Sequence, residues 1–247
     1  MALSDDIKQR LTELGLRQVV RMVARDPDCN IPALIGIARQ FAGEGAYRVA
    51  LDRLQSRLDT DPRAMRKARM VVKNPRLLEK FMVNWVLNSM FVNAPVRRRH
   101  IEAGRRCPTV VLVDPTSACN LQCTGCWVGE YAKSDRIEPG RLDRLFEEMK
   151  EMGIYWTIFS GGEPLLYPHL LELVEKHDDM AFMVFTNGTL LDDAYADELE
   201  QLGNFSPIFS LEGPREQTDA RRATAYLPRW SVPWDAVASA AFPSAPP

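Results

Sequence analysis

Hydrophobic residues recur at helical spacing through the first hundred positions of the chain, without the alternation typical of strands. This pattern predicts helices over residues 4–22, 32–41, 46–58 and 61–72, and a further helix that starts at Pro75. The dipeptides around Pro27 are expected to break the first of these helices.

The helix that starts at Pro75 is expected to carry an apolar face followed by a basic end. Its apolar positions and the arginines that follow are Leu78, Phe81, Met82, Trp85 and Met90, then Arg97, Arg98 and Arg99. Two interpretations are open: the core of a small helical bundle, which is favoured, or a membrane-surface helix with a polybasic end.

After Pro108 the pattern changes to apolar runs that alternate with helical stretches. Runs at 109–113, 155–159, 181–185 and 207–211 predict four strands, the first of them buried on both faces. Helices are predicted between them at 142–152, 170–175 and 195–202. Strand–helix alternation favours right-handed βαβ units, and therefore an α/β fold with a parallel sheet preceded by an all-helical N-terminal domain.

Charge divides the chain at the same place. The 247 residues carry a formal net charge of −2, but residues 1–108 carry +10 and residues 109–247 carry −12. We therefore expect two modules, 1–108 and 109–222. Either the basic module docks on its acidic neighbour, which is favoured, or it meets an anionic partner such as nucleic acid, a phospholipid surface or an acidic protein.

Composition excludes several broad classes of protein. Apolar residues make up 46% and charged residues 26%, as in ordinary globular domains, so a mainly disordered or fibrous chain is excluded. No run of about 18 apolar residues and no signal-like N-terminus is visible, so we expect a cytoplasmic protein.

Each predicted strand runs into a polar or glycine-containing loop. These loops cover residues 114–127, 160–164, 186–188 and 210–213. The carboxyl ends of parallel strands meet at one edge of a sheet, where ligands bind in α/β folds. We therefore expect the four loops to form one site.

The first of these loops contains three of the five cysteines, Cys119, Cys123 and Cys126, in the spacing C-x3-C-x2-C. Thiolates at such spacing suit zinc or an iron–sulfur cluster. A structural zinc usually needs four protein ligands, yet the next histidine is His169, and Cys107 precedes the strand at its other end. A cluster with one open iron is favoured over zinc or plain buried thiols.

The cysteine loop, Gly-Gly-Glu-Pro after the second strand, Thr-Asn-Gly after the third and Ser-Leu-Glu-Gly after the fourth resemble the radical SAM superfamily over residues 109–222. The similarity is to the branch that contains cofactor and peptide maturases. It implies a partial (βα) barrel and a cytoplasmic oxidoreductase-type enzyme. It also implies a [4Fe–4S] cluster on the three cysteines, which cleaves S-adenosylmethionine and yields a 5′-deoxyadenosyl radical that abstracts hydrogen from an unknown substrate. A flavodoxin- or ferredoxin-like electron donor is implied as a partner.

The resemblance also implies cofactor-binding residues, although it assigns no catalytic one. Gly161 and Gly162 would let backbone groups approach S-adenosylmethionine closely, and Glu163 would accept a hydrogen bond from its amino group. The residues expected near the ribose or the methionine end are Asn187, Ser210 and Glu212. The alternative for all of these residues is turn and helix-start chemistry.

The sequence departs from the family pattern in two places. Gly125 precedes the last cysteine, where the family often has an aromatic residue that seats the adenine, and Trp127 lies on the other side of Cys126. Four strands are predicted where the family core usually has six. Residues 223–247, of which 12 are Ala or Pro, are predicted to form a disordered tail.

These departures favour a truncated or frameshifted core over a short family member completed by a partner subunit. They leave two alternative functions open. One is an inactive fragment that still binds a cluster. The other is a basic helical adaptor that binds an anionic partner and uses the cysteine loop only as a structural metal site.

Overall fold

A computed structural model describes residues 14–15, 18–41, 46–72, 74–213 and 215–222. The chain forms two compact units that divide between Val83 and Asn84. This boundary lies well before Pro108, where the change of charge and pattern places it. The predicted tail at 223–247 and the predicted helix start at residues 4–13 lie outside the described residues. None of the described helices combines the length and apolar character needed to cross a membrane.

The N-terminal unit is helical, as predicted. Besides a helical stretch at residues 18–25, it contains α2 (Pro27–Phe41), α3 (Ala46–Thr60), α4 (Pro62–Val72) and α5 (Pro75–Phe81). Its small core consists of Val20, Val23 and Leu78, with Val19, Ile31, Leu34 and Met82 packed around them.

Helix α2 begins five residues earlier than the prediction of a start at Pro32. The Asp26 carboxylate accepts a hydrogen bond from the Cys29 amide at 3.2 Å, so it caps the helix N-terminus. Pro27 then occupies the first helical position, where a missing N–H has no cost. Pro32 therefore lies inside α2.

The segment after α5 is a π-helix, η1 (Met82–Val92), followed by α6 (Ala94–Glu102). Its predicted apolar face is divided between two cores. Met82 packs in the N-terminal unit, whereas the Trp85 ring contacts Trp156 edge-to-face, with centroids 5.1 Å apart, in the second unit. Phe81 is 44% exposed. The interpretation of this face as the core of one helical bundle is therefore wrong.

Buried polar side chains attach η1 and α6 to the second unit. Asn84 donates to the Met180 carbonyl at 2.9 Å, and the Arg97 guanidinium donates to the carbonyls of Gly153 and Ser89. These bonds explain why the boundary falls before Asn84. Because Arg97 is buried, the three consecutive arginines do not form one exposed basic end.

The second unit contains the predicted parallel sheet. Its strands are β1 (Val111–Val113), β2 (Trp156–Phe159), β3 (Ala181–Thr186) and β4 (Phe205–Phe209), which pair in the order β1-β2-β3-β4, all parallel. Strand β4 begins two residues before the predicted strand, because Phe205 already pairs with Phe182.

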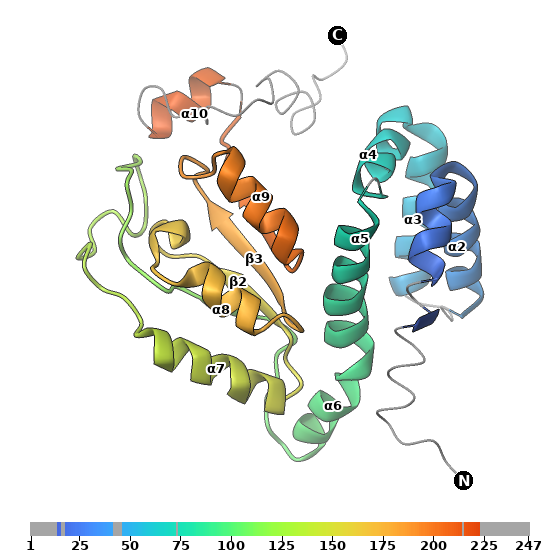
Figure 1. Cartoon of the computed structure of the whole chain (residues 1–247), viewed down its shortest axis with the longest axis horizontal. Helices are drawn as coiled ribbons and strands as arrows, with labels where there is room; N and C mark the ends of the chain where they lie inside the picture. Colours follow the sequence, from blue (N-terminus) through green and yellow to red (C-terminus); the bar gives the residue numbers. More distant parts are fainter. Residues whose placement is uncertain (1–13, 16–17, 42–45, 73, 214, 223–247) are drawn as a thin grey trace. The chain divides into compact units, whose positions relative to one another are not determined.

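Three helices connect the strands and cover one face of the sheet: α7 (Pro139–Glu151), α8 (Leu170–Lys176) and α9 (Asp193–Leu202). A short 3-10 helix η2 (Pro164–Leu166) precedes α8, and α10 (Arg215–Arg222) follows β4. In Figure 1, α8 and α9 lie against β2 and β3. The core between helices and sheet includes Leu142, Phe146, Phe159, Leu170, Val174, Phe182, Val184, Leu199 and Phe205.

The other face of the sheet carries exposed apolar side chains. Leu112 on β1 is 56% exposed and Phe185 on β3 is 40% exposed. The prediction that the first strand is buried on both faces is therefore wrong. Successive strand residues point to opposite faces, and within the described residues α7, α8 and α9 cover only one of them.

Candidate functional site

Backbone hydrogen bonds join the loops at the carboxyl ends of the strands. Gly162 N–H donates to the Thr116 carbonyl at 2.9 Å, and Glu163 N–H donates to the Ala118 carbonyl at 2.7 Å. These bonds attach the loop after β2 to the segment that leads into Cys119. The predicted convergence of the loops at one sheet edge is thus present in the structure.

The two glycines after β2 make this close approach possible. A Cβ on Gly162 would lie 2.1 Å from the Ala118 carbonyl oxygen, and one on Gly161 would lie 2.7 Å from that of Thr116. Gly161 also has φ of +103°, which favours glycine. The backbone that the glycines approach in this structure is the chain's own cysteine loop. Their contact with a cofactor stays a prediction.

Glu163 is 1% exposed, and its carboxylate joins the loops after β2 and β3. It accepts hydrogen bonds from Thr186 Oγ1 at 2.8 Å, Asn187 N at 2.7 Å and Leu165 N at 3.2 Å. Burial raises the pKa of Glu163 above its usual value, and these hydrogen bonds oppose the rise. The carboxylate therefore already has three protein donors, and its predicted bond to the amino group of S-adenosylmethionine stays a prediction.

Asn187 also bonds to the cysteine loop. Its Nδ2 donates to Asn120 Oδ1 at 2.8 Å, and Asn120 Nδ2 donates to Thr189 Oγ1 at 2.7 Å. Asn187 is buried, and its Oδ1 accepts from the Thr189 hydroxyl and amide. The structure thus brings Asn187 to the site, but through contacts with protein groups.

The three cysteines of the loop are half-buried free thiols. Burial raises the pKa of Cys123; the charges of Arg222 and Arg221 oppose this rise, and Cys119 and Cys126 add to it.

The described residues contain no group of three His, Cys, Asp or Glu side chains in a metal-binding arrangement. The three thiols fit an iron–sulfur cluster by the chemistry of the donor set. The other cysteines lie elsewhere: the Cys107 thiol contacts the Met152 carbonyl at 3.4 Å, and Cys29 belongs to α2 in the N-terminal unit.

The backbone conformation of Gly125 explains why this chain lacks the aromatic residue that the family often has before the last cysteine. Its φ of +69° lies in the left-handed region, where an aromatic residue would be strained. Trp127, two residues on, is 59% exposed and contacts Tyr131 edge-to-face with centroids 5.9 Å apart. A role for Trp127 in seating adenine stays a prediction.

Helix α10, which the sequence pattern did not predict, brings two arginines to the site. Arg221 exchanges hydrogen bonds with Thr124, between Cys123 and Cys126: its carbonyl accepts from Thr124 N at 2.9 Å and its Nε donates to Thr124 O at 3.2 Å. In Figure 1, α10 lies beyond the carboxyl end of β3.

Glu212 in the loop after β4 pairs with these arginines. Its Oε1 accepts from Arg221 and, at 2.7 Å, from Arg222. Burial acts to raise the pKa of Glu212, but the arginine hydrogen bonds hold it below its usual value. Ser210 in the same loop donates from its amide to the Thr186 carbonyl at 3.0 Å. Both predicted residues are thus at the site, and their contacts with a cofactor stay predictions.

Several residues of this network were missed in the sequence. They are Asn120, Thr186, Thr189, Arg221 and Arg222. Asn120 directly follows Cys119, and the two threonines flank an Asn-Gly turn, so proximity to the motifs was the available signal. For the arginines the sequence held no signal, because their partners depend on where α10 docks.

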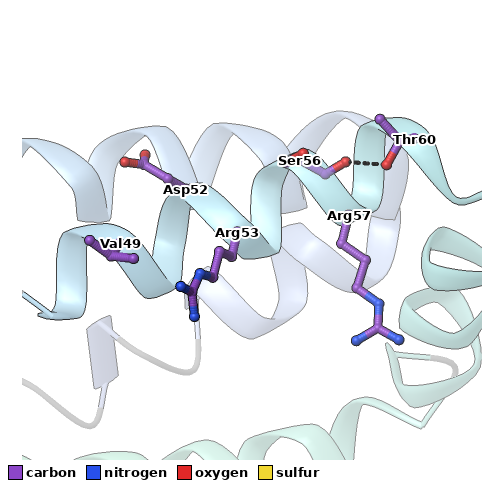
Figure 2. Close-up of a pocket in the computed structure, with 6 residues that line it drawn as sticks. All are labelled: Val49, Asp52, Arg53, Ser56, Arg57 and Thr60. Atoms are coloured by element: carbon purple, nitrogen blue, oxygen red, sulfur yellow. Dashed lines mark hydrogen bonds between the residues drawn. The ribbon is translucent and has the colours of Figure 1, made fainter.

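A shallow groove lies in the N-terminal unit, far along the chain from these loops. It measures about 500 Å³, and all six lining residues come from α3, as Figure 2 shows: Val49, Asp52, Arg53, Ser56, Arg57 and Thr60. Thr60 donates to the Ser56 carbonyl, and Asp52 forms an ion pair with Arg39. A groove on one helix surface, without convergent groups, is not a candidate site.

Comparison with known proteins supports the resemblance. The sequence model of the Radical SAM superfamily matches residues 113–240, just over half of the chain. This match extends past residue 222, where the sequence motifs had suggested that the similarity ends.

Individual proteins also match parts of the chain. The Fe-coproporphyrin III synthase of Methanosarcina barkeri is 33% identical over 119 residues, which are 46% of this chain and 29% of that protein. The cysteine-type anaerobic sulfatase-maturating enzyme of Clostridium perfringens is 30% identical over 127 residues, 44% of this chain and 34% of that protein. The structure of Streptococcus suis SuiB bound to S-adenosylmethionine is 15% identical, with a TM-score of 0.46, and the match covers 72% of this chain and 38% of that one. The chain thus spans about a third of the length of these relatives.

Proposed function

Because the chain belongs to the radical SAM superfamily, we propose that it carries the cluster- and cofactor-binding part of a radical SAM enzyme. The observation that supports this most directly is one juxtaposition. The loop with three free thiols is hydrogen-bonded to the loops after β2 and β3 and to the C-terminal end of α10. Ligands of α/β folds bind at this edge of the sheet, outside the carboxyl ends of the strands.

In this proposal Cys119, Cys123 and Cys126 would hold a [4Fe–4S] cluster, with S-adenosylmethionine bound beside it. When bound, this pair of cofactors would supply radical chemistry: one electron from an external donor would cleave S-adenosylmethionine reductively and so start hydrogen abstraction from a substrate. The protein positions these groups and excludes water.

Residues of the other loops complete the cofactor site. Gly161 and Gly162 keep the loop after β2 close to the cysteine loop, and Glu163 offers a buried carboxylate beside it. The two carboxylate oxygens offer more acceptor sites than the three protein donors use, so Glu163 suits the amino group of S-adenosylmethionine. Asn187, Ser210 and Glu212 are assigned to the ribose or methionine end.

Two requirements follow for partners and compartment. The cluster needs one electron from outside, which we assign to a flavodoxin- or ferredoxin-like donor. We expect the cytoplasm as the compartment, because free thiols and an iron–sulfur cluster persist where thiols are kept reduced.

The test is anaerobic reconstitution of the full chain with iron and sulfide. We expect about four irons and four sulfides per chain and the electron paramagnetic resonance signal of a reduced [4Fe–4S] cluster. Addition of S-adenosylmethionine and dithionite should then give 5′-deoxyadenosine, measured by chromatography. Stoichiometric zinc without iron–sulfur absorption would overturn the proposal, and a cluster without any 5′-deoxyadenosine would favour the inactive fragment.

A further inference from the structure

Resting on the proposed function, we infer that Asn120 is a positioning residue for the first cluster cysteine, acting through a closed ring of side-chain hydrogen bonds with Asn187 and Thr189. The ring joins the cysteine loop to the loop after β3. Asn120 itself would touch neither cofactor.

Each of the three side chains donates one hydrogen bond and accepts one around the ring. Asn187 Nδ2 donates to Asn120 Oδ1 at 2.8 Å, Asn120 Nδ2 donates to Thr189 Oγ1 at 2.7 Å, and the Thr189 hydroxyl donates to Asn187 Oδ1 at 2.7 Å. All three distances are normal for strong neutral hydrogen bonds. Rotating the Asn120 amide by 180° would place donor against donor, so the ring defines the orientation of this side chain.

Two of the three members belong to the loop that directly follows β3. Asn187 is buried, and its amide N–H donates to the Glu163 carboxylate at 2.7 Å. Thr189 N–H donates to Asn187 Oδ1 at 2.9 Å. Of the three residues, only Asn120 belongs to the cysteine loop. The ring therefore fixes the position of that loop relative to β3.

Cys119 is thereby anchored on both sides. The residue before it, Ala118, accepts a hydrogen bond at its carbonyl from Glu163 N–H at 2.7 Å. The residue after it, Asn120, is held by the ring. Residues 114–127 form no helix or strand in the structure, so these two anchors supply order that secondary structure does not. Groups that orient metal ligands typically change metal affinity by roughly 10–100-fold when removed.

The experiment compares four variants of the full chain after anaerobic reconstitution. Asn120→Ala removes one member of the ring. Thr189→Val removes the hydroxyl and nearly preserves shape, whereas Thr189→Ser keeps the hydroxyl and serves as the rescue. Gln122→Ala is the matched control, because Gln122 is an exposed residue of the same loop. The readouts are the rate of iron release to a chelator, the midpoint potential of the cluster, and the thermal unfolding temperature.

We expect Asn120→Ala and Thr189→Val to release iron about ten-fold faster than the unmodified chain and to shift its midpoint potential, at nearly unchanged unfolding temperature. Thr189→Ser and Gln122→Ala should behave like the unmodified chain. If both ring-breaking variants keep the cluster as firmly as Gln122→Ala, the inference is overturned while the proposed function stands. If Asn120→Ala fails to fold, Thr189→Val against Thr189→Ser decides the question. An unmodified chain without an iron–sulfur cluster would overturn both.

Discussion

The two units of the chain use polar and charged side chains in different ways. In the sheet unit several of them are buried at the carboxyl ends of strands and hydrogen-bonded, as in Glu163 with its three donors and Asn187 with its bonds to Asn120 and Thr189. In the helical unit they form exposed pairs, such as Arg69 with Asp28, whose side chains are 53% and 54% exposed.

The buried side chains hold the loops of the candidate site together, whereas the exposed ion pairs keep the protein surface hydrated. Burying a carboxylate or an amide costs free energy unless its hydrogen-bond partners are all present. We therefore expect such networks where a functional site depends on their geometry. Exposed ion pairs contribute about 0–1 kcal/mol and are easily replaced. The family match begins at residue 113 and so covers only the unit with the buried network.

The largest effect should come from the cysteines. Replacing any one of Cys119, Cys123 and Cys126 by Ala should abolish the cluster, because three thiolates are the least that hold it in the proposed site. Iron and sulfide analysis after anaerobic reconstitution measures this. Cys29→Ala and Cys107→Ala are the controls and should keep the cluster; its loss in Cys107→Ala would show that the ligand assignment is wrong.

The buried carboxylate of Glu163 should have the next largest effect. Glu163→Ala leaves three donors without a partner, so the free energy of unfolding of the sheet unit should fall by about 2–4 kcal/mol. Chemical denaturation followed by circular dichroism measures this. A loss below about 1 kcal/mol would mean that the network is not held together by this carboxylate.

Glu163→Gln separates the structural role of this residue from its predicted role in cofactor binding. We expect it to keep the cluster but to bind S-adenosylmethionine about ten-fold more weakly, because a charge-assisted hydrogen bond contributes roughly 1.5–3 kcal/mol. Calorimetric titration of the reconstituted protein measures this. Unchanged affinity would leave Glu163 with the bridging role alone.

Asp143 on α7 is 27% exposed, between the buried Glu163 and the exposed Asp28, and so tests an intermediate case of the comparison. Hydrogen bonds from Lys176 and His177 hold the pKa of Asp143 below its ordinary 3.8, so the ionised carboxylate stabilises the fold above that pH. Asp143→Asn should therefore lower the free energy of unfolding by about 1 kcal/mol at pH 7. The difference should shrink as the pH falls below 3.8 toward the lowered pKa; a constant difference down to pH 2 would contradict this assignment.

The exposed pair of the helical unit should show the smallest effect. Asp28→Asn removes its ion pair with Arg69, and we expect a change in the free energy of unfolding within about 0.5 kcal/mol. A loss as large as that of Glu163→Ala would remove the contrast between the two units. Denaturation of both variants under the same salt concentration makes the comparison direct.

The sequence alone predicted the parallel four-stranded sheet, the helices between the strands and the convergence of four polar loops. It did so because hydrophobic periodicity is a local property, and because parallel strands joined by crossovers must place their carboxyl ends together. The spacing of Cys119, Cys123 and Cys126 likewise predicted a ligand set, and this assignment stays a prediction. These predictions needed no knowledge of which residues meet across the fold.

Only the tertiary structure decided which groups meet. It directs the Glu163 carboxylate to Thr186 and Asn187, leaves Leu112 exposed, and divides one apolar helix face between two cores at Val83 and Asn84. Each of these outcomes depends on contacts between segments far apart in the chain. The type of a side chain decides only whether it can be a hydrogen-bond donor, an acceptor or an apolar surface. The packing of the whole unit decides which partner it meets, and the hydrophobic periodicity of one segment carries no information about that partner.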